Sequence, residues 1–342
     1  MPRRWPKAQL GGLAMVALVE AGLARSGLGV DPVGLEWRYG DKAARRRAST
    51  AQVIGLGDSL IRYGLDPKVL RERLGLEARN LGLSAAPPSA TDLVLAHALE
   101  AGARPAAILV DISPFLLDGS ATPSDHLRPE VATLADALGL AVADRDASEF
   151  ALLTLGRLVP SVAGRQRLRE RLAGRRPCAE PTPPWFAGGW STLVRMLYPA
   201  DWRCLPTRRA AVERLLGRAD GLGIAVYWLM PPFDDAVAER RRALGVEDRY
   251  TGFARQMQAL FPGLMVIDGR RLAYDASLRA DPIHLNPTGA RAFSAEVADV
   301  LARPPASRWA DLGTGGLLAP AASGNHDKRQ IPGRVAALAG GP

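Results

Sequence analysis

The sequence predicts a doubly wound α/β domain built on a parallel five-stranded sheet. Short apolar runs alternate with helical segments along the chain, which is the pattern of repeated strand–helix–strand units. Within each run the apolar residues are continuous and do not alternate with polar ones. Continuous runs are typical of strands that helices cover on both faces, as in a parallel sheet.

The elements of the first half follow in order from residue 51. Strands are expected over residues 53–57, 79–83 and 106–112, where the apolar runs lie. Helices are expected between them, over residues 67–74, where Arg and Glu alternate on the outer face, and over residues 89–101, where apolar residues recur at helical spacing.

The same pattern returns after residue 205. Strands are expected over residues 223–230 and 264–268, and helices over residues 210–222, 237–244 and 250–261. Asn286 followed by Pro287 predicts the start of a last helix that runs to about residue 301, since Asn caps helices and Pro favours the first helical position.

Residues 114–205 interrupt this rhythm and predict an insertion within the α/β domain of residues 48–302. A basic stretch is followed there by Trp185, Trp190 and Trp202. Connections at the carboxyl ends of parallel strands line the ligand crevice, so we expect the insertion to overhang the site. Residues 303–342 are rich in Gly, Ala and Pro and are expected to form a loose tail.

The N-terminal segment, residues 1–30, has three cations ahead of an apolar run over residues 10–28. This pattern is typical of a secretory signal or a membrane anchor, and it predicts a transmembrane signal-anchor helix with the rest of the chain outside the cytoplasm, either membrane-anchored or secreted. Glu20 lies inside the run, and a bilayer requires about 20 apolar residues. An ordinary amphipathic first helix is therefore the alternative.

The composition is that of a globular protein and argues against nucleic-acid binding and against a metal site. Of 342 residues, 47% are hydrophobic and 23% charged, as in a globular protein with a buried core. The net charge of +9 comes from scattered arginines, without the basic stripe that nucleic-acid binding requires. Cys178 and Cys204 could form one disulfide or be two unrelated thiols. With no CxxC pair and no clustered His, we expect no metal site.

The stretch Gly57-Asp58-Ser59-Leu60 ends the first apolar run. A hydroxyl at this place projects from the sheet edge beside backbone N–H groups that can receive negative charge. Ile61 excludes the Gly-x-Ser-x-Gly nucleophile elbow. The alternative is a turn in which Ser59 caps a helix.

Asp281 and His284 lie three residues apart near the end of the domain. The Asp281 carboxylate could orient the imidazole and stabilise its charged form after Ser59 gives up a proton. The alternative is a loop histidine beside a helix start. The other histidines lie in a helix, in the insertion and in the tail (His97, His126 and His326).

In this order the motifs resemble the SGNH, or GDSL, hydrolase superfamily. The resemblance covers about residues 51–302 without the insertion, and includes Gly82 after the second strand and Gly289 after Asp281-x-x-His284. It implies a flavodoxin-like sheet, Ser59 as nucleophile, His284 as base and Asp281 as its orienter. It also implies oxyanion-hole donors in the backbone N–H groups of Ser59 and Gly82, and no cofactor.

One departure from the superfamily concerns the third strand. Members of the superfamily usually have Gly-x-Asn-Asp after this strand, with the Asn as a third oxyanion donor, whereas this chain has Asp111-Ile112-Ser113-Pro114. Ser113 stands in the place of the Asn, with a shorter side chain. Loss of one such donor can cost about 3 kcal/mol of transition-state stabilisation.

Two functions are therefore expected. The first is a serine acyl-ester hydrolase or O-acyltransferase that acts on a small ester or an extracytoplasmic acylated glycan, since the superfamily includes membrane-anchored members of similar layout that O-acetylate polysaccharides. The three tryptophans of the insertion could stack on sugar rings or form its own core. The second is a non-catalytic, membrane-anchored SGNH-like protein that binds glycan or a protein partner, favoured by the missing Asn.

Overall fold

The computed structural model describes residues 7–26, 32–118, 128, 130–145, 147–159, 161, 198, 201–303 and 307–313. The chain divides into two compact units. One combines Met1–Arg38 with Leu127–Thr182, and the other combines Tyr39–His126 with Pro183–Pro342. The second unit contains the sheet, so the α/β domain is assembled from two separate parts of the chain.

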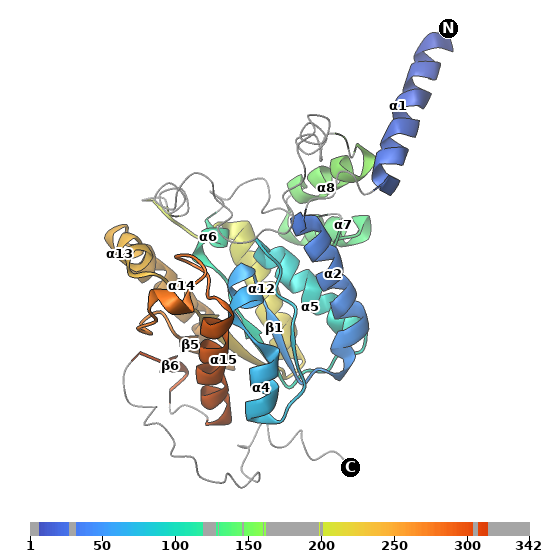
Figure 1. The fold of residues 1–342 in the computed structure, drawn as a ribbon. Coiled ribbons are helices and arrows are strands. Elements are labelled where there is room, and N and C mark those ends of the chain that lie inside the picture. The colour runs from blue at the N-terminus through green and yellow to red at the C-terminus, as the bar shows by residue number, and fades with distance from the viewer. Residues whose placement is uncertain are drawn as a thin grey trace. The chain divides into compact units, whose positions relative to one another are not determined.

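The sheet has six strands, all parallel, in the order β2-β1-β3-β4-β5-β6. Figure 1 labels β1, inside this sheet, and β5 and β6 at one side of it. The strands are β1 (Val53–Leu56), β2 (Ala78–Asn80), β3 (Ala107–Val110), β4 (Ala225–Met230), β5 (Leu264–Asp268) and β6 (Trp309–Asp311). Every residue of β1 and β3 is buried, as continuous apolar runs predict. The α/β class is confirmed, and the order of the first five strands is that of flavodoxin-like folds.

The prediction of five strands was wrong by one. β6 lies in the segment predicted as a loose tail and pairs with β5, Ile267 opposite Ala310. Trp309 secures it by donating from Nε1 to Asp268 Oδ2 at 3.3 Å. A three-residue strand presents no apolar run, so the sequence pattern did not reveal it.

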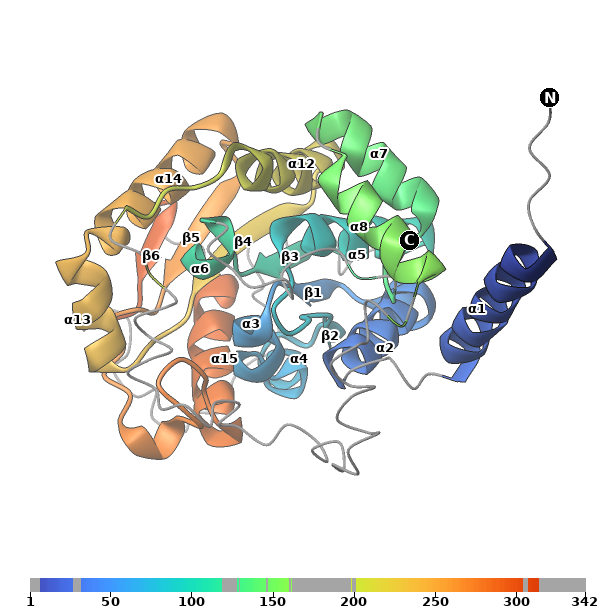
Figure 2. The same ribbon diagram turned by 90° about the horizontal axis from the view of Figure 1, so that it is seen from above.

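Helices cover both faces of the sheet (Figure 2). The helices of one face are α3 (Ser59–Gly64), α4 (Pro67–Leu74) and α15 (Pro287–Ala302), and those of the other are α5 (Pro88–Glu100), α12 (Pro206–Gly221) and α14 (Val246–Leu260). A further helix, α13 (Asp235–Ala243), precedes α14. On the α15 face, Ile61, Leu70 and Phe293 pack on strand residues such as Leu229 and Ile267.

The first unit contains α1 (Lys7–Ser26), α7 (Leu134–Asp144) and α8 (Ser148–Leu158), while α2 (Pro32–Arg47) continues from it into the second unit. α7 and α8 pack against each other. α7 begins with a capping box in which the side chains and backbone amides of Thr133 and Asp136 bond reciprocally.

The predicted transmembrane signal-anchor was wrong. None of the helices in the described ranges is sufficiently long and apolar to cross a bilayer. α1 has 20 residues, but three are glycines and one is Glu20. The Glu20 carboxylate accepts hydrogen bonds from Ser161, from the backbone N–H at 2.9 Å and from the hydroxyl. α1 therefore carries a polar, hydrogen-bonded group within its apolar run.

The insertion is described only in part, because residues 162–197 lie outside the described ranges, together with Cys178, Trp185 and Trp190. The overhang of the insertion above the site stays a prediction. At its C-terminal end Trp202 is buried in the sheet unit and donates from Nε1 to the Pro114 carbonyl at 2.7 Å, so Trp202 is a core residue.

Cys204 is a free thiol and is not in a disulfide. Burial raises the pKa of this thiol to about 12.

Candidate active site

Ser59 lies where β1 passes into α3. Gly57 adopts φ +139°, and a Cβ there would come within 2.6 Å of the Asp111 carbonyl oxygen, so only glycine fits this turn. Asp58 is the N-cap of α3 and accepts a hydrogen bond from the Leu60 N–H at 2.7 Å. Ser59 follows as the first helical residue, half-buried at the carboxyl end of the sheet. The sharp, capped turn between β1 and α3 therefore places the Ser59 hydroxyl at the carboxyl end of the sheet.

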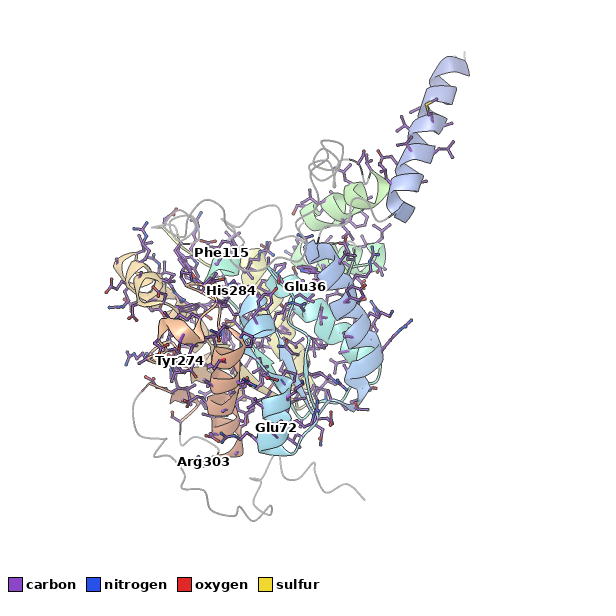
Figure 3. The ribbon with its side chains drawn as sticks, viewed as in Figure 1. Glu36, Glu72, Phe115, Tyr274, His284 and Arg303 are labelled. Atoms are coloured by element: carbon purple, nitrogen blue, oxygen red, sulfur yellow. The ribbon has the colours of Figure 1, made fainter. Side chains whose placement is uncertain are left out.

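His284 brings its imidazole to Ser59 from the loop before α15. Its Nε2 lies 2.8 Å from Ser59 Oγ, and its Nδ1 lies 2.6 Å from Asp281 Oδ2. A carboxylate at Nδ1 favours the tautomer protonated there, which leaves Nε2 to accept the serine proton. His284 lies at the end of the domain opposite Glu72 and Arg303 (Figure 3).

The Asp281 carboxylate is fixed by its own loop. Its Oδ1 accepts hydrogen bonds from the N–H groups of Ile283 at 2.9 Å and His284 at 2.8 Å. Both Asp281 and His284 are 7% exposed, so their pairing is shielded from water. The two oxygens thus have different roles, one holding the loop and the other orienting the imidazole.

The start of α15 determines the shape of this loop. Asn286 caps the helix by accepting the N–H groups of Thr288 and Gly289 at 2.9 and 3.0 Å. Its Nδ2 donates to the Ser277 carbonyl at 2.6 Å. A Cβ on Gly289 would clash with the Leu278 carbonyl oxygen. The segment therefore caps α15 through Asn286 and also brings His284 to Ser59, so the two interpretations of it do not exclude each other.

Tyr63, which the sequence analysis did not select, packs against the imidazole of His284. Their ring centroids are 5.7 Å apart with an interplanar angle of 85°, an edge-to-face contact. The Tyr63 hydroxyl lies 3.5 Å from Ser84 Oγ, in the loop after β2. The ring fixes the position of the imidazole from the α3 side. An isolated tyrosine four residues after Ser59 gives no signal of this in the sequence.

Gly82 does not have the geometry expected of an oxyanion donor. Its N–H donates to Asn80 Oδ1 at 2.9 Å, and a Cβ on it would come within 2.7 Å of the Arg62 backbone nitrogen. Asn80 also donates to the carbonyls of Ile61 and Leu65, both at 2.8 Å. Gly82 and Asn80 therefore fasten the β2 loop to α3, and the amide of Gly82 is already engaged.

The strained residue of the β2 loop is Ala85. Its φ of +55° lies in the left-handed region, which costs a non-glycine residue about 1 kcal/mol and occurs preferentially at functional sites. Ala85 is half-buried between Ser84 and Ala86, which are both buried. Within the described part of the chain its N–H donates no hydrogen bond. Alanine gives no sequence signal of a positive φ, so this position was missed.

Ser113 follows β3 in a loop that two aromatic residues secure. Tyr250 donates from its hydroxyl to the Ile112 carbonyl at 2.8 Å, and Trp202 donates to the Pro114 carbonyl. Ser113 precedes α6 (Pro114–Leu117) without capping it through its side chain. Its hydroxyl is therefore not used to stabilise that helix.

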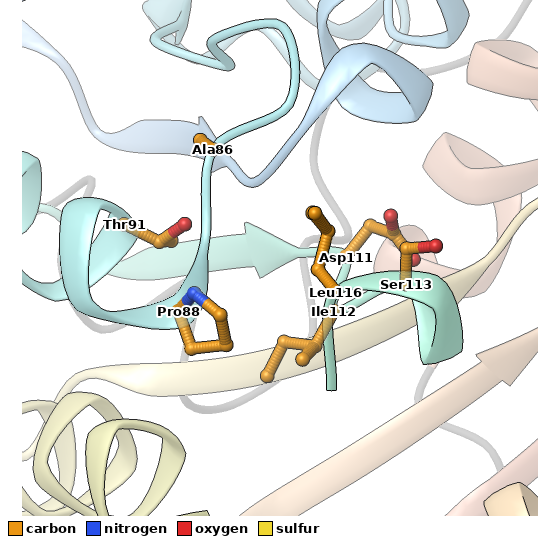
Figure 4. Close-up of a pocket in the computed structure, with 7 residues that line it drawn as sticks. All are labelled: Ala86, Pro88, Thr91, Asp111, Ile112, Ser113 and Leu116. Atoms are coloured by element: carbon orange, nitrogen blue, oxygen red, sulfur yellow. The ribbon is translucent and has the colours of Figure 1, made fainter. Parts of the chain in front are cut away.

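Ser113 also lines a small hollow at the carboxyl end of β3. One wall comes from Asp111 and Ser113 in the loop after β3 and from Leu116 in α6, and the other includes Ala86 and Thr91 (Figure 4). The polar side chains of the lining are those of Thr91, Asp111 and Ser113, and the other lining residues are apolar. The hollow adjoins both loops that could stabilise an oxyanion.

Other candidate residues lie away from this site or outside the described ranges. His97 is buried in α5, with Nδ1 2.6 Å from Asp41 Oδ1 and Nε2 2.7 Å from an Arg45 guanidinium nitrogen. His126 and His326 lie in parts of the chain that the structure does not describe. Among the described residues no group of three or more His, Cys, Asp or Glu side chains could hold a metal ion.

Comparisons with known proteins add no family assignment. No protein-family model matches the chain. A search among curated proteins also finds no match. The functional assignment therefore rests on the geometry of Ser59, His284 and Asp281.

Proposed function

We propose that the chain is a serine acyl-ester hydrolase or O-acyltransferase of the SGNH type. The observation that carries the proposal is the continuous set of hydrogen bonds from Ser59 Oγ to His284 and from His284 to Asp281, at 2.8 and 2.6 Å. Such distances allow a proton to move from the serine to the imidazole as the hydroxyl attacks an ester carbonyl.

The reaction follows from these positions. Ser59 Oγ attacks the carbonyl carbon while His284 Nε2 takes its proton, and Asp281 stabilises the imidazolium that forms. The imidazolium then protonates the leaving alcohol, which leaves an acyl group on Ser59. Water or a sugar hydroxyl, deprotonated in turn by His284, resolves the acyl-enzyme and decides between hydrolysis and transfer.

The oxyanion is proposed to bind between three loops. The Ser59 N–H at the start of α3 is the first donor, and the N–H of Ala85 replaces the engaged amide of Gly82 as the second. The Ser113 hydroxyl is the third, in the place of the Asn that the superfamily uses. The anchoring of its loop by Tyr250 and Trp202 offsets the shorter reach, because a donor that is held in place needs no reorganisation.

The substrate class in this proposal is a small ester or an acylated glycan. A location outside the cytoplasm stays a prediction from the cations that precede the apolar run of residues 10–28. The competing function is a non-catalytic SGNH-like binding protein, which the absence of the oxyanion Asn favours. A hydrogen-bonded Ser59 and His284 argue against it, since a binding protein has no need of that pairing.

Hydrolysis of p-nitrophenyl acetate tests the proposal. We expect the wild-type chain to release p-nitrophenol, and Ser59→Ala to reduce kcat by about 10⁴-fold or more. Adding a soluble oligosaccharide acceptor and weighing the products by mass spectrometry separates transfer from hydrolysis. A wild-type rate no higher than that of Ser59→Ala would favour the binding protein instead.

A further inference from the structure

Arg241 of α13 is buried in the sheet unit together with its charge. Its side chain is 0% exposed, and its Nε lies 2.7 Å from Glu247 Oε2. Glu247 also pairs with Arg270, so its carboxylate is shared between two cations. Within the described part of the chain, the two terminal nitrogens of Arg241 donate no hydrogen bond. Burying such donors costs free energy, so the ion pair alone does not account for an arginine at this position.

Aromatic rings surround the guanidinium of Arg241. Its central carbon lies 4.5 Å from the ring centre of Phe233, 5.4 Å from that of Tyr198 and 5.6 Å from that of Tyr250. All three distances are within the range of about 6 Å for a cation–π contact. The rings belong to three separate segments, namely the segment after β4, the end of the insertion and helix α14. Arg241 is therefore a contact that these three segments share.

The segment after β4 leads to the loop that carries the proposed base. Asp234 follows Phe233 and donates from its N–H to the Pro282 carbonyl at 2.9 Å. Pro282 is next to Asp281, whose carboxylate orients His284. The ring of Phe233, the nearest of the three to the guanidinium, is thus one residue away from a hydrogen bond to the catalytic loop.

Helix α14 leads to the loop that carries the proposed third oxyanion donor. α13 and α14 are in contact and lie side by side (Figure 2). The Tyr250 hydroxyl, on α14, donates to the Ile112 carbonyl at 2.8 Å, and Ile112 precedes Ser113. The same hydroxyl accepts a hydrogen bond from Trp228 Nε1 at 3.0 Å. The position of the Tyr250 ring therefore determines where the backbone before Ser113 lies.

We propose that Arg241 is a positioning residue that joins two loops of the active site. By stacking on Phe233 and Tyr250 at once, its guanidinium sets the distance between the loop of His284 and the loop of Ser113. An apolar side chain of similar bulk would fill the same space, but only a planar cation binds the faces of several rings together. This inference rests on the proposed function, since it concerns the geometry of the same site.

Two substitutions of Arg241 in the full-length chain test this role on p-nitrophenyl acetate. Arg241→Met has similar bulk without the planar cation, and Arg241→Lys keeps the charge without the plane. We expect kcat to fall about 100-fold in Arg241→Met and about 10-fold in Arg241→Lys, with KM retained, as for reacting groups displaced by about 1 Å. Arg242→Met is the matched control, because Arg242 is exposed on the same helix, and its kcat should equal that of the wild type. Circular dichroism checks that all variants are folded.

A double-mutant cycle with Ser113→Ala separates positioning from a general loss of stability. If Arg241 holds the loop of Ser113, the hydroxyl is already misplaced in Arg241→Met. Removing it there should lower kcat by less than about 10-fold, against about 100-fold in the wild-type background. The cycle is made with Arg241→Lys if the Met variant does not fold. Additive losses, or wild-type kcat in folded Arg241 variants, would overturn the proposal.

Amide hydrogen exchange tests the same link without any turnover. The peptides that contain Asp234 and Ser113 should exchange faster in Arg241→Met than in the wild type, and at wild-type rates in Arg242→Met. Unchanged exchange in both peptides of a folded Arg241 variant would also overturn the proposal. If the wild-type protein has no esterase activity and Ser59 is not labelled by a fluorophosphonate, the proposed function fails instead, and the exchange rates alone then decide whether Arg241 joins the two loops.

Discussion

His284 Nε2 lies 2.8 Å from Ser59 Oγ, although 225 positions separate the two residues in the chain. The two helices that flank the site account for this proximity. α15, which follows His284, packs on both α3 and α4, and the Asp66 N–H between those helices donates to Ser294 Oγ of α15 at 2.7 Å. The pairing of the two residues is thus built into one face of the sheet, and it is the relationship on which the account depends.

Replacing Asp281 by Asn should nearly abolish turnover. In Asp281→Asn the amide oxygen would keep the bonds from the Ile283 and His284 N–H groups, so the amide NH2 would face His284 Nδ1. An NH2 group there donates to Nδ1 and favours the wrong tautomer of the imidazole, so kcat should fall by about 10⁴-fold. Steady-state kinetics on p-nitrophenyl acetate measures this. Asp275→Asn, in the same loop, is the matched control, because Asn can still accept the Ser277 N–H, and kcat should be unchanged. Equal losses in both variants would mean that the loop as a whole, and not the orienting carboxylate, is responsible.

Gly57→Ala should destabilise the fold far more than Gly75→Ala. Both glycines have positive φ, +139° and +68°. A Cβ on Gly57 would also come within 2.6 Å of the Asp111 carbonyl, whereas a Cβ on Gly75 has nothing within 4 Å. We expect losses in the free energy of unfolding of about 3 kcal/mol at Gly57 and about 1 kcal/mol at Gly75, measured by urea unfolding. Similar losses at the two positions would contradict the tight approach of β1 to β3.

Ser113→Ala tests the third oxyanion donor. Removing one such donor lowers kcat by about 100-fold, with KM largely retained, because the interaction forms only in the transition state. Ser89→Ala is the matched control: within the described chain the Ser89 hydroxyl is buried without a hydrogen-bond partner, so its removal should leave kcat unchanged. If Ser113→Ala behaves like the control, the hydroxyl of Ser113 is not an oxyanion donor.

The stability of Asp111→Asn relative to wild type should rise with pH. Burial raises the pKa of Asp111 in the folded protein well above its ordinary value of 3.8. The stability that its proton supplies is full below pH 3.8 and is lost as the pH rises through the folded-state pKa, because the unfolded chain ionises first. The Asn variant has no proton to lose. The difference between its free energy of unfolding and that of the wild type should therefore increase by up to about 1.4 kcal/mol per pH unit.

Urea unfolding across this pH range measures the difference, and Asp275→Asn gives a control of opposite sign. Hydrogen bonds from Ser277 lower the pKa of Asp275, so its carboxylate stabilises the fold above its unfolded-state pKa of 3.8 and that stability is lost as the pH falls through the folded pKa. The wild-type protein should therefore be more stable than Asp275→Asn above pH 3.8. A pH-independent difference for Asp111→Asn would mean that Asp111 titrates normally.

Much of the fold could be predicted because its signals are local. The strand over 264–268 and the helix over 67–74 have the predicted bounds, since an apolar run and an Asp–Pro cap mark them in the sequence. β6 could not be predicted, because three residues gain their strand conformation only from pairing with β5. The N-terminal helix was misjudged because its cations and apolar run resemble an anchor, whereas no helix in the described part of the chain is long and apolar enough to cross a membrane.

In the candidate site, too, some residues are marked by local sequence motifs, whereas the roles of others depend on the folded structure. Ser59, Asp281 and His284 were identified from short motifs, and the structure brings these three together. Gly82 was selected by position, but the direction of its N–H depends on Asn80, which only the folded loop reveals. The strained backbone of Ala85 and the raised pKa of Asp111 depend on backbone angles and on burial, so no sequence pattern marks them.

Covalent labelling with a fluorophosphonate, followed by peptide mass spectrometry, tests directly whether Ser59 is a nucleophile. The reagent reacts with a serine whose hydroxyl is activated by a neighbouring base. We expect a single adduct on the peptide that contains Ser59 in the wild-type protein and in Ser89→Ala, and no adduct in Ser59→Ala or His284→Ala. An unlabelled wild-type protein, or the same labelling in Ser59→Ala, would contradict Ser59 as the nucleophile.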